Sequence, residues 1–107
     1  MSYRVELTED AELDLEEIID YIAQKVSTDR AAHVLAKIQH LCDSLDTMPN
    51  RGNYPPELSR VGITHFREVF FKPYRIIYEL VGGVVVIHCI LDGRRDMQAL
   101  LKRRLLR

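Results

Sequence analysis

The sequence has few of the features that mark metal, redox or membrane proteins. Its 107 residues contain two cysteines, Cys42 and Cys89, which lie far apart in apolar stretches. Zinc ligands and redox cysteines occur at close, paired spacings, so we expect neither kind of site and predict free buried thiols in a reducing compartment. No charged segment followed by an apolar core opens the chain, and the longest apolar run, Val84–Leu91, is too short to cross a bilayer. We therefore expect a cytoplasmic protein with no membrane partner.

Motifs for nucleotide hydrolysis and covalent catalysis are also missing. The chain has no glycine-rich phosphate loop, no cluster with metal-ligand spacing and no Gly-x-Ser-x-Gly elbow. These absences argue against an ATPase, a zinc enzyme or a serine hydrolase, and we expect no cofactor. With 47% hydrophobic and 29% charged residues, the sequence suits one domain spanning residues 1–107.

The formal net charge of −1 conceals an uneven distribution of charge along the chain. Between Glu6 and Asp20 there are eight acidic residues and no basic one. Between Arg60 and Arg107 there are ten basic residues and four acidic ones. A basic C-terminal part favours a surface that attracts phosphates or an acidic partner, although a charged face can also be only solvated.

Hydrophobic periodicity predicts the order of helices and strands. Period-two alternation favours strands, and repeats at three and four residues favour helices. The first helix is expected to start at Thr8, the second after a polar break with the capping candidates Ser27, Thr28 and Asp29, and the last at Asp96, which can cap or begin it. The segment Met48–Gly62, rich in proline, glycine and asparagine, is predicted to be a loop. The predicted strands are Tyr3–Leu7, Thr64–Phe71, Tyr74–Val81 and Val84–Leu91.

These elements predict an α+β fold with the order β-α-α-β-β-β-α. Tight connections at Lys72-Pro73 and Gly82-Gly83 favour antiparallel neighbours. The strand Val84–Leu91 is apolar on both faces, which is typical of a central strand. We therefore expect a helical hairpin packed on a mainly antiparallel four-stranded sheet.

Arg75 is the most unusual residue in the predicted sheet, because an arginine in an apolar strand needs a partner. It can pair with Glu68 or Glu79, or it can line a site for phosphate or carboxylate. Arg67 would lie beside Arg75 if the register of the hairpin is tight. Two arginines on one face would repel each other unless an anion lay between them.

Arg94 and Arg95 follow the predicted central strand and precede the last helix. The amino terminus of a helix favours anions, so these arginines are placed to join a basic patch for a nucleic-acid backbone or an acidic protein surface. The last helix adds further arginines. The predicted partner-binding patch consists of Arg67, Arg75, Arg94, Arg95, Arg103 and Arg104.

A metal-independent ribonuclease also needs groups that accept and donate protons. His33 and His40 lie off the apolar stripe of the second helix and are expected to be surface residues. His88, inside the central strand, is expected to be a core histidine with a hydrogen-bond partner, which leaves His65 as a weak acid/base candidate. No tyrosine follows Tyr78.

Several segments in this order resemble the RelE/ParE superfamily of toxins from bacterial toxin–antitoxin modules, and the resemblance spans nearly the whole chain. They include Tyr3-Arg4-Val5-Glu6-Leu7, the first helix, Phe66-Arg67-Glu68-Val69, Tyr74-Arg75-Ile76-Ile77-Tyr78 and Gly93-Arg94-Arg95-Asp96 with its trailing leucines. The resemblance implies a helical hairpin on a curved antiparallel sheet. It also implies a cognate antitoxin whose C-terminal segment wraps around the toxin.

The two branches of this superfamily imply different functions. In the RelE branch, which cuts messenger RNA in the ribosome, the resemblance would make Arg67, Arg75, Arg94 and Arg95 catalytic. However, Val69 stands where a second lysine is expected, and 99–101 is apolar where a catalytic tyrosine is expected.

The C-terminal segment is more similar to the ParE branch, whose characterised members poison DNA gyrase. We therefore predict a ParE-like toxin of a plasmid-stabilisation type, with a RelE-like endoribonuclease as the alternative. A third possibility is a module that has lost toxicity and serves only as a binding partner.

Overall fold

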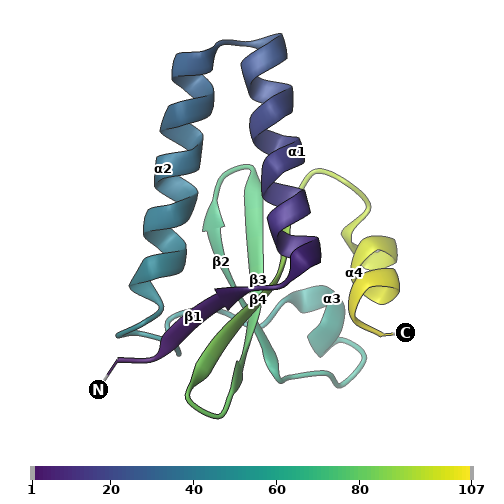
Figure 1. The fold of residues 1–107 in the computed structure, drawn as a ribbon. Coiled ribbons are helices and arrows are strands. Elements are labelled where there is room, and N and C mark those ends of the chain that lie inside the picture. Colours follow the sequence, from purple (N-terminus) through teal and green to yellow (C-terminus); the bar gives the residue numbers. More distant parts are fainter. Residues whose placement is uncertain (1, 107) are drawn as a thin grey trace.

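The computed structural model describes residues 2–106 and confirms the predicted order of elements (Figure 1). Arg107, one of the ten basic residues of the C-terminal part, lies outside the described residues. A short helix, α3, lies within the segment predicted to be a loop. The elements are β1 (Arg4–Leu7), α1 (Glu9–Lys25), α2 (Thr28–Ser44), α3 (Pro56–Ser59), β2 (Phe66–Phe71), β3 (Tyr74–Val81), β4 (Val84–Asp92) and α4 (Met97–Leu105).

Side-chain caps fix the starts of the three longer helices. Thr8, Ser27 and Asp96 each accept a hydrogen bond from the backbone amide three residues later, at 3.0–3.1 Å. These bonds satisfy amide groups that have no partner inside the helix. The predicted starts at Thr8 and Asp96 are therefore confirmed, and of the three candidates Ser27, Thr28 and Asp29 the cap of the second helix is Ser27.

The sheet is mixed, with strand order β1-β4-β3-β2. The pairs β2–β3 and β3–β4 are antiparallel, as predicted, whereas β1 runs parallel to β4. The chain leaves β1 through the α1–α2 hairpin and returns through β2 and β3, so β4 can lie beside β1 in the same direction (Figure 1). β4 is thus an interior strand between β1 and β3, as its apolar sequence predicts.

β4 contributes to two hydrophobic cores, one on each face of the sheet. The register between β3 and β4 shifts at His88. Ile77 pairs with Cys89 and the next residue, Tyr78, pairs with Ile87, so His88 is the extra residue of a β-bulge in β4. On one face, α1 and α2 pack on the sheet around buried residues that include Ile38, Tyr78, Ile87 and Ile90. On the other face, α3 and α4 pack around Leu58, Phe66, Ile77, Cys89, Leu91, Met97, Leu100 and Leu101.

The outer edge of β4 extends beyond the end of β1. The last β1 pair joins Leu7 to Ile87, and β4 continues to Asp92 without a strand on that side. The edge past Ile87 therefore faces α1 rather than another strand.

Candidate functional site

Arg75 is bound inside the protein by two carboxylates. Its Nε donates to Glu68 Oε1 at 2.7 Å, and its Nη1 and Nη2 donate to the two Glu57 oxygens at 2.8 and 2.7 Å. Only 11% of the Arg75 side chain and 2% of the Glu68 side chain are exposed. The predicted pairing with Glu68 is confirmed, and α3 supplies a second partner, Glu57, that the sequence did not indicate.

The three charges affect one another's protonation. Hydrogen bonds from Arg75 lower the pKa of Glu57, whereas burial raises the pKa of Glu68 despite the same arginine. The two carboxylates in turn raise the pKa of Arg75. With Glu57 and Glu68 ionised, their charges more than offset the charge of Arg75, so an external anion would have to displace a carboxylate to reach it.

Arg67 lies on the opposite face of the sheet from Arg75. Arg67 pairs across the hairpin with Tyr78, which faces the α1–α2 side, whereas Arg75 pairs with Phe70. The expectation that the two arginines lie side by side is wrong, because 67 and 70 differ by an odd number of residues and side chains alternate along a strand.

Arg67 instead secures the loop before α3. Its Nη1 donates to the carbonyl oxygens of Gly52 at 2.9 Å and Asn50 at 3.3 Å, and its guanidinium carbon lies 4.7 Å from the centre of the Tyr54 ring. The buried Tyr78 hydroxyl donates to Pro49 O at 2.7 Å and accepts from the Gly52 amide. Arg67 and Tyr78 thus hold the same loop.

The arginines after β4 are more accessible. Arg94 is 76% exposed and makes an ion pair with Asp92 at 2.6 Å, and its guanidinium lowers the pKa of that carboxyl. Arg95 and Arg103 are exposed, and neither side chain makes a hydrogen bond or ion pair with any described residue. Of the six predicted patch residues, Arg94, Arg95 and Arg103 are therefore the ones placed to meet a partner.

Arg104 is half-buried and links α4 to α1 across the β4 edge. Its guanidinium donates to both oxygens of Asp14 at 2.9 Å and to His88 O at 3.0 Å. Asp14 Oδ2 also accepts the Ile90 amide at 3.0 Å. Asp14 and Arg104 thus bind the amide and carbonyl groups that a neighbouring strand would otherwise bind.

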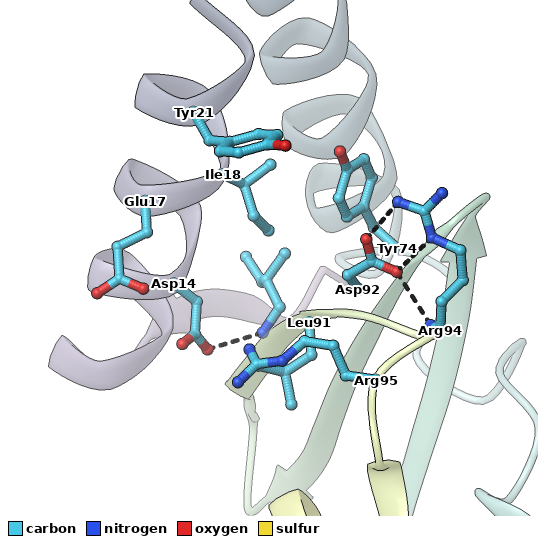
Figure 2. Close-up of a pocket in the computed structure, with 10 residues that line it drawn as sticks. Asp14, Glu17, Ile18, Tyr21, Tyr74, Leu91, Asp92, Arg94 and Arg95 are labelled. Atoms are coloured by element: carbon cyan, nitrogen blue, oxygen red, sulfur yellow. Dashed lines mark hydrogen bonds and ion pairs between the residues drawn. The ribbon is translucent and has the colours of Figure 1, made fainter. Parts of the chain in front are cut away.

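A groove runs along α1 beside this edge. One part is a cavity of about 290 Å³ between α1 and the end of β4 (Figure 2). A second hollow of about 260 Å³ shares Asp14 and Glu17 with the first, and the two together are termed the α1 groove. The cavity is lined by Asp14, Glu17, Ile18, Tyr21, Tyr74, Ile90, Leu91, Asp92, Arg94 and Arg95, and the hollow adds Asp10, Leu13, Arg103 and Arg104.

The histidines do not converge with these arginines. His65 is exposed and stacks on Phe66, with ring centres 4.3 Å apart, and Phe66 meets His88 edge-on at 5.5 Å. His88 Nε2 lies 2.8 Å from Glu79 Oε1, which confirms that this half-buried histidine has a partner. The two α2 histidines are exposed, as predicted.

Cys42 and Cys89 are free and buried, as predicted. Burial raises the pKa of each thiol to about 12, so both stay protonated near neutral pH. Among residues 2–106, no group of three or more metal-binding side chains is arranged to hold an ion. No helix in the same range is long and apolar enough to cross a membrane.

Comparisons with known proteins identify the relatives of this chain. Residues 5–97 match a family model described as the ParE toxin of the type II toxin–antitoxin system parDE. A chain from the chromosomal ParDE system of P. aeruginosa has a similar structure, with a TM-score of 0.69, 19% identity, and 83% of this chain and 94% of that chain covered.

A chain from the toxin–antitoxin complex RelBE2 of Mycobacterium tuberculosis gives a TM-score of 0.62 at 20% identity, with 84% and 96% covered. Comparison with curated proteins gives no match. At these identities the two solved structures are evidence for the fold, whereas the family match covers most of the chain.

Proposed function

Because the chain belongs to the ParE toxin family of type II toxin–antitoxin systems, we propose that it arrests growth by binding DNA gyrase. The observation that favours binding over RNA cleavage is the enclosure of Arg75. This arginine matches the position that would stabilise phosphate charge in the RelE branch, yet its donors are taken by Glu57 and Glu68. Exposed cations near the end of β4 and on α4 instead suit contact with a large acidic surface.

The alternative, a ribosome-dependent endoribonuclease, has less support from the geometry. It would require Arg75 to release two carboxylates, one of them 2% exposed. His65 and His88 lie around Phe66, apart from the cavity lined by Arg94 and Arg95. Neither histidine is therefore placed to transfer a proton beside the accessible cations.

We also propose that a cognate antitoxin binds this chain and masks its toxic surface. The two solved relatives come from a ParDE system and from a toxin–antitoxin complex, which supports a partner of this kind. The α1 groove is the surface best suited to it, because it combines a cavity, exposed apolar side chains and free charges. Gyrase and such an antitoxin both act in the cytoplasm, so we place the function there.

A supercoiling assay with purified gyrase tests the proposed target. We expect the chain to inhibit supercoiling, and Arg95→Glu to weaken inhibition by about tenfold or more, because a reversed charge opposes an acidic surface. Lys37→Glu, which reverses an exposed charge on α2, is the matched control and should inhibit like the unchanged chain. Normal supercoiling at every toxin concentration, together with ribosome-dependent cleavage of messenger RNA, would favour the alternative.

A further inference from the structure

The cavity of the α1 groove is lined by charges of opposite sign that come from two different segments. Glu17 belongs to α1, whereas Arg95 belongs to the connection after β4 and its side chain extends towards α1 (Figure 2). Both residues are exposed. A segment that lies across the cavity would therefore meet a carboxylate and a guanidinium in turn.

Glu17 and Arg95 differ from the other charged residues of the cavity because neither side chain is paired with another residue among those that the structure describes. Asp14 is bound by Arg104 and by the Ile90 amide, and Asp92 is bound by Arg94. Neither Glu17 nor the Arg95 side chain makes a hydrogen bond or ion pair with any described residue. Within residues 2–106, Glu17 and Arg95 are thus the cavity charges left available to a partner.

The lining of the cavity is mainly apolar. The rings of Tyr21 and Tyr74 stand on either side of its upper part, Ile18 lies directly below Tyr21 (Figure 2), and Ile90 is a further lining residue. Tyr21 is 64% exposed, and Leu13, two helical turns away on the same side of α1, is 53% exposed. Apolar and aromatic side chains exposed around a cavity are typical of a surface that a partner covers.

We propose that this cavity binds a segment of the antitoxin that carries an apolar residue, a basic residue and an acidic residue. The apolar side chain enters between Tyr21 and Tyr74, the basic residue pairs with Glu17, and the acidic residue pairs with Arg95. The proposal rests on the proposed function, in which an antitoxin binds this chain. It goes further by assigning mixed charge to the bound segment, whereas the basic patch predicted from the sequence suits a purely acidic one.

Charge complementarity is the reason for this choice of occupant. An acidic segment alone would meet repulsion from Glu17 and from the other acidic residues of α1, which carries seven in all. A basic segment alone would meet Arg94 and Arg95. A cavity of about 290 Å³ is small and admits one or two side chains of a passing segment.

The test uses the whole chain and the protein encoded beside it as the antitoxin. We expect Glu17→Lys and Arg95→Glu each to raise the Kd of the purified complex by about tenfold or more. Glu16→Lys and Lys37→Glu are the matched controls, since they reverse exposed charges that do not line this cavity, and they should change the Kd by less than about threefold. Thermal unfolding of each free variant establishes that it is folded.

A charge swap gives a sharper readout. Reversing the basic residue of the antitoxin segment should restore binding to Glu17→Lys while weakening binding to the unchanged chain. The inference is overturned if either cavity variant binds the antitoxin like its control, or if those substitutions alter only self-association of this chain. If the unchanged chain binds no antitoxin at all, the proposed partner fails and the inference fails with it.

Discussion

The Arg75 guanidinium donates three hydrogen bonds to two carboxylates, and these bonds limit what the fold tolerates at this position. Replacement by alanine would leave the 2%-exposed Glu68 without its cation. Removing one partner of a buried ion pair typically costs about 3–5 kcal/mol, because the other charge stays buried. We therefore expect Arg75→Ala to lower the free energy of unfolding by about 3–5 kcal/mol, as measured by urea denaturation.

Arg94→Ala is the control for this prediction. Arg94 also pairs with an acidic residue, but its side chain is 76% exposed, so solvent screens the pair and little stability should be lost. Equal effects of the two substitutions would contradict the structural role assigned to Arg75. Partial unfolding of Arg75→Ala would also explain any loss of toxicity without a catalytic role.

The Glu57–Arg75 pair also predicts a dependence of stability on pH. Since the pair lowers the pKa of Glu57 in the folded state, its contribution is present above the ordinary value of 4.5 and is lost as the pH falls towards the lowered pKa. Burial raises the pKa of Glu68, so Glu68 changes the stability with pH in the opposite direction. The pH dependence of the total stability therefore does not isolate the contribution of the Glu57–Arg75 pair.

The comparison that isolates this pair is between the unchanged chain and Glu57→Gln. We expect the difference in their unfolding free energies to be largest near about pH 7 and to shrink as the pH falls below 4.5 towards the lowered pKa of folded Glu57. Urea denaturation at a series of pH values measures this difference. A difference that stays constant over the range would show that Glu57 is not held ionised by Arg75.

At the level of elements, the end of β4 is held by side chains rather than by a strand. Asp14 on α1 accepts the Ile90 amide, and Arg104 on α4 donates to His88 O. An uncovered edge is a site for unwanted strand pairing, and charged side chains on the edge prevent it. This pair of residues therefore explains how β4 extends past β1 without a strand neighbour.

Hydrogen exchange of the Ile90 amide measures this cap directly. We expect Asp14→Ala to increase exchange at Ile90 by about tenfold or more, because the amide loses its acceptor, while amides bonded within the sheet keep most of their protection. Glu17→Ala, one helical turn further along α1, should leave exchange at Ile90 unchanged. Fast exchange at Ile90 in the unchanged chain would contradict the observed bond.

Signals local in the sequence predicted most elements, whereas features that depend on distant pairings were missed. Helix caps and strand alternation depend on residues close together in the sequence, so Thr8 and Asp96 could be identified directly and the cap of α2 could be narrowed to Ser27, Thr28 or Asp29. The parallel β1–β4 pair and the bulge at His88 depend on contacts across the chain. The sequence could have separated Arg67 from Arg75, because counting outward from a two-residue turn at Lys72-Pro73 places them on opposite faces.

The candidate site was less predictable for physical reasons. Glu57 lies in a segment without periodicity, so nothing indicated that it would reach Arg75 from a short helix. Asp14 and Glu17 are two acids in a uniformly acidic face, and the sequence does not show which of them meets the β4 edge. Arg94 and Arg95 were correctly expected to emerge between the last strand and the last helix.

The whole molecule combines a tightly bound interior cation with exposed charges beside one groove. Arg75 is enclosed between the sheet and α3, while Glu17, Arg94, Arg95 and Arg103 lie around the α1 groove. Such a molecule is better suited to binding a macromolecule than to stabilising charge on a reacting phosphate. In this account a target and an antitoxin both recognise the chain through exposed charge.

The most direct test of this account is to induce the chain alone in a bacterium and to follow DNA and protein synthesis by pulse labelling during the first minutes. We expect growth to stop, DNA synthesis to fall first, and messenger RNA to stay intact while protein synthesis continues. An early loss of protein synthesis with cleaved transcripts would contradict it and favour an endoribonuclease. Unchanged growth with full expression would show that the chain is not toxic.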